Sequence, residues 1–191
     1  MESMQDQQRG KMKIAVGPWG GQGGVSWDDG TYHGIREISL AYGRCIDSIS
    51  LVYDKNGKAI KSEKHGGTGG TKTAQIKLNY PEEYIVSVTG YYSPVIRGAT
   101  PVIRSLTFKT NKRTFGPYGP EEGIPFAFSM DGGKIIGFKG RSGWYIDAIG
   151  FHVARIQSTN LTKRLQQWLQ RSLDPKNSKE SLNGKNAKVY V

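Results

Sequence analysis

Residues 143–147 of this chain read Gly143-Trp144-Tyr145-Ile146-Asp147, and the same Gly-x-x-x-Asp pattern occurs earlier as Gly43-Arg44-Cys45-Ile46-Asp47. A glycine loop is also present twice, as Trp19-Gly20-Gly21-Gln22-Gly23-Gly24 and as His65-Gly66-Gly67-Thr68-Gly69-Gly70. The first loop opens the patterned part of the chain, and the second Gly-x-x-x-Asp motif closes it. Motifs that recur in this way indicate that similar structural units recur along the chain.

Around these motifs, between residues 13 and 155, apolar and polar side chains alternate repeatedly. The apolar members of five such runs are Ile38, Leu40 and Tyr42; Ile49, Leu51 and Tyr53; Ile76 and Leu78; Tyr84, Val86 and Val88; Leu106 and Phe108. A period of two is typical of half-buried antiparallel strands. Turn signals such as Asp29-Gly30, Asn56-Gly57 and Asp131-Gly132-Gly133 separate the runs.

The spacing of the glycine loops predicts three units. Gly20 and Gly66 are 46 residues apart, and a third glycine-containing loop, Phe115-Gly116-Pro117-Tyr118-Gly119-Pro120, follows about 50 residues later. We therefore expect an all-β domain over residues 13–155, built from three small sheets with approximate three-fold symmetry.

The composition limits the cellular setting and the chemistry. With one cysteine, Cys45, the chain cannot form an internal disulfide. Residues 1–13 contain no apolar segment typical of a secretion signal, and no run approaches the roughly 18 apolar residues of a membrane span. We expect a cytoplasmic protein, or one shared between cytoplasm and nucleus. The three histidines show no metal-ligand spacing, so neither a metal nor a cofactor is expected.

The net charge of +11 is distributed unevenly. Residues 156–191 hold seven Lys or Arg against two Asp or Glu, a net +5, whereas residues 1–12 balance at zero. Because the patterned part has no basic stripe with interleaved aromatic residues, we expect a solvated basic surface and no nucleic-acid partner.

Both ends differ in character from the patterned part. Residues 1–12 are predicted to be a disordered N-terminal extension, and residues 156–191 a basic C-terminal extension. Within the latter, apolar residues at helical spacing predict an amphipathic helix over about 160–173: Leu161, Leu165, Trp168, Leu169 and Leu173. Such a helix either binds an anionic membrane surface or a partner, or else docks on the domain or joins two subunits.

Two longer stretches carry a family resemblance. They are Gly17-Pro18-Trp19-Gly20-Gly21-Gln22-Gly23-Gly24 and Gly140-Arg141-Ser142-Gly143-Trp144-Tyr145-Ile146-Asp147-Ala148-Ile149-Gly150. In order and spacing, they resemble the jacalin-related lectins over about residues 13–155, as does the segment 104–119. The resemblance implies a β-prism I fold of three four-stranded Greek-key sheets. It also implies metal-independent binding of sugars at loops on one end of the prism.

The resemblance also implies which residues bind the sugar. Transferred to this chain, the binding residues of the family are Gly24, Gly143, Trp144, Tyr145 and Asp147, which we call site 1. Gly24, Trp144 and Tyr145 are expected to donate backbone N–H groups, and the Asp147 carboxylate to accept from two sugar hydroxyls. This division of roles suits the vicinal hydroxyls of a pyranose.

Some members of the family carry a second site in the second repeat. The matching residues here are Gly70, Arg44, Cys45 and Asp47, which we call site 2; the alternative is that Asp47 only caps a turn. The third repeat reads Gly90-Tyr91-Tyr92-Ser93-Pro94 and has no aspartate at the matching position. No third site is therefore expected.

The resemblance favours mannose and glucose as ligands. Galactose binders of the family are cleaved just before the residue matching Gly24, and here that residue lies inside a continuous segment. We expect a mannose-binding homodimer or higher oligomer that recognises mannose-rich glycans in plant defence or stress response. It is not expected to be an enzyme, because Asp47 and Asp147 belong to different units and cannot flank one glycosidic bond. The alternative function is a degenerate lectin scaffold that acts as a membrane or protein adaptor through its basic tail.

Overall fold

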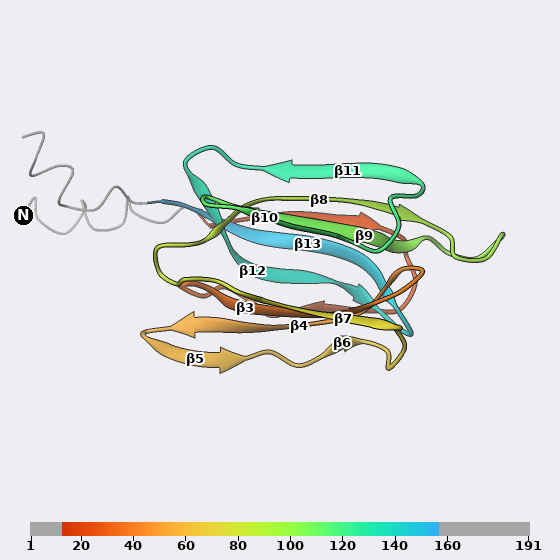
Figure 1. Ribbon diagram of the computed structural model, residues 1–191, viewed down its shortest axis with the longest axis horizontal. Helices are drawn as coiled ribbons and strands as arrows, with labels where there is room; N and C mark the ends of the chain where they lie inside the picture. Colours follow the sequence, from red (N-terminus) through yellow and green to blue (C-terminus); the bar gives the residue numbers. More distant parts are fainter. Residues whose placement is uncertain (1–12, 157–191) are drawn as a thin grey trace, which may run out of the picture. The chain divides into compact units, whose positions relative to one another are not determined.

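The computed structural model describes residues 13–156, and this part consists of strands joined by turns and loops (Figure 1). The strands are β1 Lys13–Gly20, β2 Val25–Asp28, β3 Gly34–Tyr42, β4 Ile46–Lys55, β5 Lys58–Lys61, β6 His65–Gly66, β7 Lys72–Lys77, β8 Ile85–Ser93, β9 Val102–Thr110, β10 Thr114–Tyr118, β11 Ile124–Ser129, β12 Gly133–Ser142 and β13 Ile146–Arg155. The expected extension 1–12 and the helix over 160–173 lie outside the described residues. No helix within 13–156 could cross a membrane.

The strands form three antiparallel sheets, as the three-unit pattern predicted. The first sheet has the order β1-β13-β12-β2, the second β5-β4-β3-β7 with β6 also paired to β4, and the third β10-β9-β8-β11. Each sheet is a long central hairpin flanked by two outer strands that a further loop connects. The second sheet counts five strands because one outer strand is divided into β5 and β6. The all-β, three-sheet architecture is confirmed.

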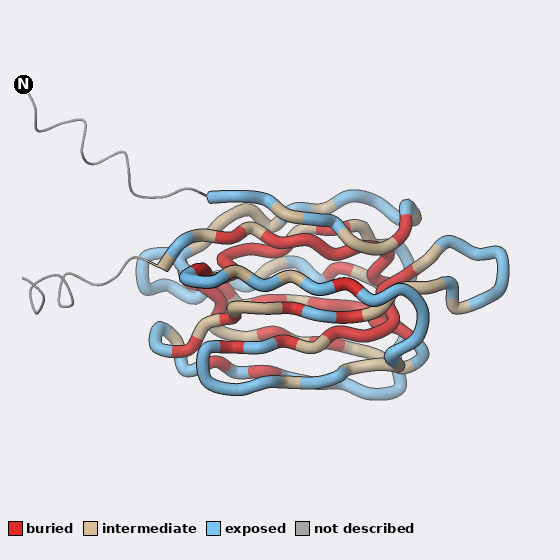
Figure 2. The backbone as a smooth tube through the Cα atoms, turned by 90° about the horizontal axis from the view of Figure 1, so that it is seen from above, coloured by how far each residue is buried: buried red, intermediate tan, exposed pale blue. Residues whose placement is uncertain are grey.

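The three sheets pack their inner faces into one core (Figure 2). Phe108, Phe138 and Phe151 are fully buried, and the Phe138 and Phe151 rings meet edge-on with centroids 5.1 Å apart. Phe108 comes from the third sheet and approaches Phe138 of the first at 6.4 Å. Trp19, which opens the first glycine loop, stacks on Phe126 of the third sheet at 5.6 Å. The loop is therefore anchored in the core at its first residue.

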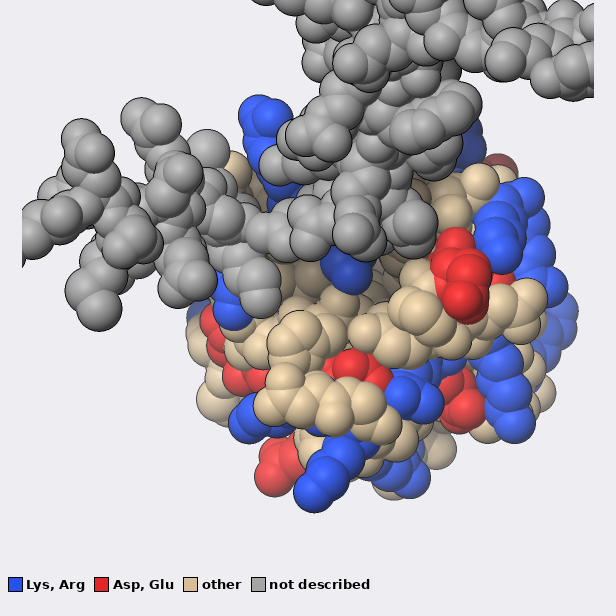
Figure 3. Space-filling model, turned by 90° about the vertical axis from the view of Figure 1, so that its left-hand side faces the viewer, with Lys and Arg blue, Asp and Glu red and all other residues tan. Residues whose placement is uncertain are grey.

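The units contact one another in a cycle at the end where the glycine loops lie, on the right of Figure 1. A Cβ atom on Gly21 would overlap the carbonyl group of Pro101, and one on Gly67 would overlap the carbonyl group of Trp144. Arg104 of the third unit donates from Nε to the carbonyl oxygen of Arg44 at 2.7 Å. The first two glycine loops are thus held against the hairpin of another unit, and a hydrogen bond between two hairpins completes the cycle. The opposite end, seen in Figure 3, carries intermixed acidic and basic side chains.

Candidate functional site

Site 1 forms where the β1–β2 loop meets the tip of the β12–β13 hairpin. Gly24 has φ +61°, and a Cβ atom on it would overlap the carbonyl group of Ser142 and lie 2.6 Å from Oδ2 of Asp147. A Cβ atom on Gly23 would overlap Oδ1 of the same carboxylate. Glycine is therefore required here because the loop backbone lies directly against the Asp147 side chain.

The Asp147 carboxylate is only 6% exposed, although it lies at the end of the molecule. Burial raises its pKa above the ordinary value of 3.8, while the backbone N–H of Gly143 and the charge of Arg141 act in the opposite direction. Gly143 donates to the carbonyl oxygen of Tyr145 at 3.0 Å and so closes the hairpin tip. The site thus combines a buried carboxylate with a tight turn of backbone.

All five predicted residues of site 1 line one cleft of about 390 Å3. The remaining lining residues are Gly23, Val95, Ile96, Ala99, Thr100 and Val102. Trp144 is 82% exposed and Tyr145 is 37% exposed, so their rings border the cleft without filling it. The N–H groups of Gly24, Trp144 and Tyr145 have no hydrogen-bond partner within residues 13–156. Three unpaired donors therefore lie beside one carboxylate.

Site 2 repeats part of this arrangement. Asp47 is also 6% exposed, burial raises its pKa, and a Cβ atom on Gly69 would lie 2.5 Å from its Oδ1. Gly43 donates to the carbonyl oxygen of Cys45 at 2.9 Å, as Gly143 does at site 1. The second glycine loop is anchored by His65, whose ring stacks on Trp27 at 3.7 Å and whose Nε2 lies 2.8 Å from Oδ1 of Asp29.

The second loop is one residue longer than the first, which the sequence comparison did not reveal. Both loops leave their sheets at matching positions, since Gly20 pairs with Ala148 and Gly66 with Ser48. They rejoin the sheets at Val25, paired with Ser142, and at Lys72, paired with Tyr42. Residues 22–24 therefore correspond to residues 68–71.

The extra residue changes the neighbour of the hairpin glycine. A Cβ atom on Gly143 would lie 3.5 Å from Cα of Gly24, whereas one on Gly43 would lie 3.3 Å from Oγ1 of Thr71. By register Thr71, not Gly70, takes the place of Gly24, and its N–H donates to the carbonyl oxygen of Tyr42 at 3.2 Å. Gly70, the residue predicted for site 2, packs over Ala41.

The other predicted residues of site 2 carry unlike side chains. Arg44 is exposed and its Nη2 donates to the carbonyl oxygen of Val95 at 3.3 Å. Cys45 is 2% exposed, and burial, with a smaller contribution from Asp47, raises the pKa of its thiol to about 12. At neutral pH the thiol is therefore protonated and enclosed.

In the third unit an arginine takes the aspartate position. Gly119 faces the carbonyl of Arg104 as Gly20 faces that of Asp147, so Arg104 corresponds to Asp147. Its buried guanidinium donates to Glu122 at 2.6 Å and to Ser93 and Pro94. Gly90 pairs with Leu106 within the strands and therefore corresponds to Gly140 rather than Gly143. Matching the third repeat at Gly90 was thus wrong by register.

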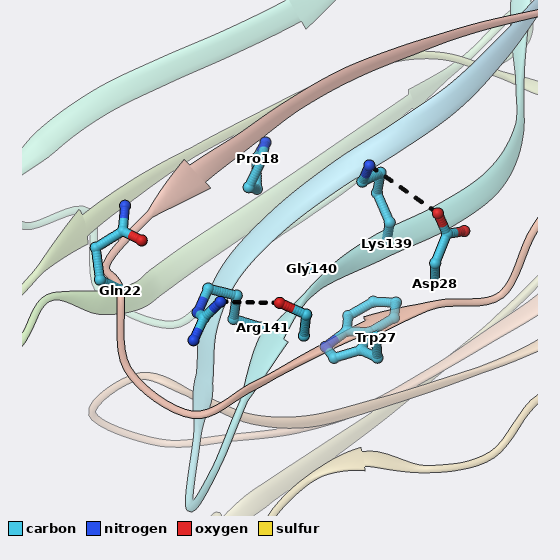
Figure 4. A pocket seen from close by; sticks show the side chains of 8 residues that line it. Pro18, Gln22, Trp27, Asp28, Lys139, Gly140 and Arg141 are labelled. Atoms are coloured by element: carbon cyan, nitrogen blue, oxygen red, sulfur yellow. Dashed lines mark hydrogen bonds and ion pairs between the residues drawn. The ribbon is translucent and has the colours of Figure 1, made fainter.

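Arg141 is a further residue that the sequence reasoning missed. It projects from β12 and lines a groove together with Trp27 and Lys139 (Figure 4). From there its guanidinium reaches the first glycine loop from behind. The available signal was the contrast between Arg141-Ser142-Gly143 and Ala41-Tyr42-Gly43.

Within residues 13–156, no cluster of three or more His, Cys, Asp or Glu could hold a metal ion.

Comparisons with known proteins establish the family. Residues 16–152 match the Jacalin-like lectin domain, so the chain belongs to that family. Jacalin-related lectin 19 of Arabidopsis thaliana is 59% identical over 173 residues, which cover 88% of this chain and 98% of that protein. The galactose-specific lectin of Morus indica is 47% identical over 156 residues, which cover 78% and 98%.

A solved structure supports the same assignment. A mannose-specific jacalin-related lectin from Morus nigra in complex with mannose is 52% identical, with a TM-score of 0.72 over 74% of this chain and 94% of that one. The fold is therefore the β-prism of the jacalin-related lectins, as expected. This is a family of carbohydrate-binding proteins and not of enzymes.

Proposed function

We propose that the chain is a metal-independent lectin for mannose and glucose that binds the sugar at site 1. The observation that carries this proposal is the group of unpaired N–H donors of Gly24, Trp144 and Tyr145 beside the Asp147 carboxylate. Vicinal hydroxyls of a pyranose donate to the carboxylate in charge-assisted hydrogen bonds and accept from the N–H groups. A rigid sugar thus pairs with the carboxylate and with the three N–H groups at once.

The preference for mannose and glucose over galactose rests on Gly24. Relatives of similar sequence identity include lectins of both specificities. The Morus nigra lectin is mannose-specific, and the Morus indica lectin is galactose-specific. Identity alone therefore does not decide between them. In this chain residue 24 lies inside a continuous loop and offers an amide N–H, without the charge of a free amino group. The bound mannose of the Morus nigra structure supports the same choice.

We extend the proposal to site 2, which binds the same sugars more weakly. Its buried Asp47 and the N–H groups of Arg44 and Cys45, unpaired within the described part of the chain, repeat the plan of site 1. A single sugar at either site is held by a few hydrogen bonds that water also offers, so we expect dissociation constants on the order of millimolar. Mannose-rich glycans that engage several sites, or several subunits of a homo-oligomer, gain affinity by multivalency.

Affinity measurements with two sugars test the proposal. Titration with methyl α-mannoside and methyl α-galactoside in the presence of a chelator should show binding of the mannoside and little of the galactoside. Asp147→Asn should remove the tighter binding, while Asp131→Asn, which changes an exposed turn, serves as the control. Absence of binding for both sugars by the wild type would refute the proposal. The adaptor alternative depends on the basic extension 156–191, of which only Ile156 lies in the described part of the chain.

A further inference from the structure

Arg141 makes two hydrogen bonds to the first glycine loop and one to the strand that follows it. Its Nε donates to the carbonyl oxygen of Gly23, its Nη2 to that of Gly24 and its Nη1 to Oγ of Ser26, each at 2.8 Å. The side chain is half-buried, and its planar guanidinium presents donors in a fixed fork. One residue of β12 therefore fixes two successive carbonyl groups of the loop and one side chain of the following strand β2.

The contact with Gly23 also sets the direction of the Gly24 N–H, which is proposed to donate to the sugar. The carbonyl group of Gly23 and the N–H of Gly24 belong to one planar peptide group, in which they point in opposite directions. Because Arg141 holds the carbonyl oxygen from behind, the N–H of Gly24 is directed away from the guanidinium. A charged donor on the carbonyl also polarises the peptide, which strengthens its N–H as a donor.

Site 2 lacks this support. In the aligned motifs Ala41 takes the position of Arg141, and a Cβ atom on Gly70 would lie 3.1 Å from Cβ of Ala41. The small side chain allows the longer loop to settle onto the strand, and the N–H of Thr71 is used within the protein. The arginine and the shorter loop therefore occur together at site 1 and are absent together at site 2.

We propose that Arg141 is a positioning residue that orients the N–H of Gly24 toward the sugar by holding the carbonyl groups of Gly23 and Gly24. This inference rests on the proposed function of site 1. It assigns the difference between the two sites to a residue that does not touch the sugar. At site 1 the N–H of Gly24 is oriented and, within residues 13–156, free before the ligand arrives, whereas at site 2 the corresponding N–H of Thr71 is already bonded to the carbonyl oxygen of Tyr42.

Arg141→Met tests the proposal, with Arg141→Lys as the matched variant that keeps the charge but loses the fork. We expect Arg141→Met to weaken methyl α-mannoside binding at site 1 by about tenfold or more. The Arg141→Lys variant should weaken it nearly as much. Thermal unfolding of both variants monitors the fold, and if Arg141→Met fails to fold, Arg141→Lys carries the same comparison.

The pH profile separates positioning from a purely structural role. The charged and titratable groups near Asp147 include Arg141 on β12, Tyr145 at the hairpin tip and the thiol of Cys45. Arg141→Met should move the acid midpoint of mannoside binding to higher pH, because it removes the positive charge near the carboxylate. The Arg141→Lys variant should keep the wild-type midpoint despite its weaker binding.

A measurement without sugar distinguishes failure of this inference from failure of the proposed function. In the 15N relaxation of the free protein, the order parameter of Gly24 should fall from about 0.85 to below about 0.6 in Arg141→Met, while that of Gly70 stays unchanged. If the wild type binds no mannoside but this change occurs, the proposed function fails and the positioning role stands. An Arg141→Met variant with wild-type affinity and a wild-type Gly24 order parameter would overturn the inference.

Discussion

The two glycine loops follow the same plan and differ in three connected details. At site 1 three residues, 22–24, span the gap, Arg141 holds their carbonyl groups, and Gly24 lies beside Gly143. At site 2 four residues, 68–71, span it, Ala41 offers no such contact, and Thr71 lies beside Gly43. With the same aspartate and a similar glycine loop, the register of the loop therefore decides whether a backbone donor is left free beside the carboxylate.

The largest effect is expected at Gly24. In Gly24→Ala, the added Cβ overlaps the carbonyl group of Ser142, and alanine is strained at φ +61°. We expect site 1 to lose at least about 100-fold in mannoside affinity and the free energy of unfolding to fall by roughly 1–3 kcal/mol. Calorimetric titration and thermal unfolding measure the two effects.

Gly30→Ala is the control for Gly24→Ala. Gly30 has φ +79° with no atom within 4 Å of its added Cβ, so this variant carries the backbone strain without the overlap. It should lose stability and keep its sugar affinity. Wild-type mannoside affinity in Gly24→Ala would show that the loop does not contribute its backbone as described.

The pH dependence of binding is the next largest effect. Burial raises the pKa of both Asp147 and Asp47 above 3.8, and protonation replaces the charge-assisted hydrogen bonds from sugar hydroxyls by weaker ones to a neutral carboxyl group. Binding should therefore be complete at neutral pH and be lost as the pH falls, with midpoints above 3.8. Titrations between pH 7 and 3.5 measure the midpoints, and binding that persists unchanged at pH 3.8 would contradict this prediction.

The fold itself should persist over much of that range. The bond from Arg113 is the main reason that the pKa of the buried Glu83 is lowered to about 2. Since this pKa is lowered on folding, the ion pair stabilises the fold above the ordinary value of 4.5 and loses its effect as the pH falls toward 2. Tryptophan fluorescence during the same titrations should therefore stay native where sugar binding is already lost.

Shortening the second loop should bring the two sites closer. Deletion of Gly70 in an Asp147→Asn background leaves three residues between Gly67 and Lys72, as at site 1. We expect the affinity of site 2 for mannoside to rise roughly threefold to tenfold, because the shorter loop releases the N–H of Thr71 from the carbonyl oxygen of Tyr42 and can offer it to the sugar. Thr71→Gly in the same background is the matched control, since it removes the hydroxyl and keeps the extra residue. A folded deletion variant with unchanged affinity would show that loop length does not limit site 2.

The smallest effect is expected at Cys45. Its thiol is buried and has a pKa of about 12, so iodoacetamide at pH 8 should leave the folded protein unmodified. Cys45→Ala should bind mannoside at site 2 within about twofold of wild type, because only the backbone of this residue is assigned to the sugar. A larger loss of mannoside affinity in a variant of unchanged stability would contradict this prediction, because it would show that the Cys45 side chain contributes to binding.

The fold and the grouping of the site 1 residues could be predicted, because both depend on patterns that are visible in the amino-acid sequence. Alternation such as that of Ile38, Leu40 and Tyr42 marks the inner face of a strand, and the spaced glycine loops mark the three units. Site 1 followed from motifs more than one hundred residues apart that a known family combines.

Register and long-range contacts were not predictable in the same way. Thr71 takes the place of Gly24 because strand pairing, not the match of glycines, decides where the loop rejoins the sheet. The position of Arg104 in the third unit was missed because residues 94–101 lengthen its hairpin and move the motif out of alignment. The contacts of Arg141 join residues that are 115–118 positions apart, so no local sequence pattern predicts them.

The central claim is that the chain holds two unequal sugar sites, each built on one aspartate. Calorimetric titration of the full chain with methyl α-mannoside, on wild type, Asp147→Ala and Asp47→Ala, tests it most directly. The account predicts two sugars per chain for the wild type, with the tighter site lost in Asp147→Ala and the weaker one in Asp47→Ala. A single site that Asp147→Ala abolishes and Asp47→Ala leaves intact would contradict the second site, and binding that survives in Asp147→Ala at full affinity would contradict the first.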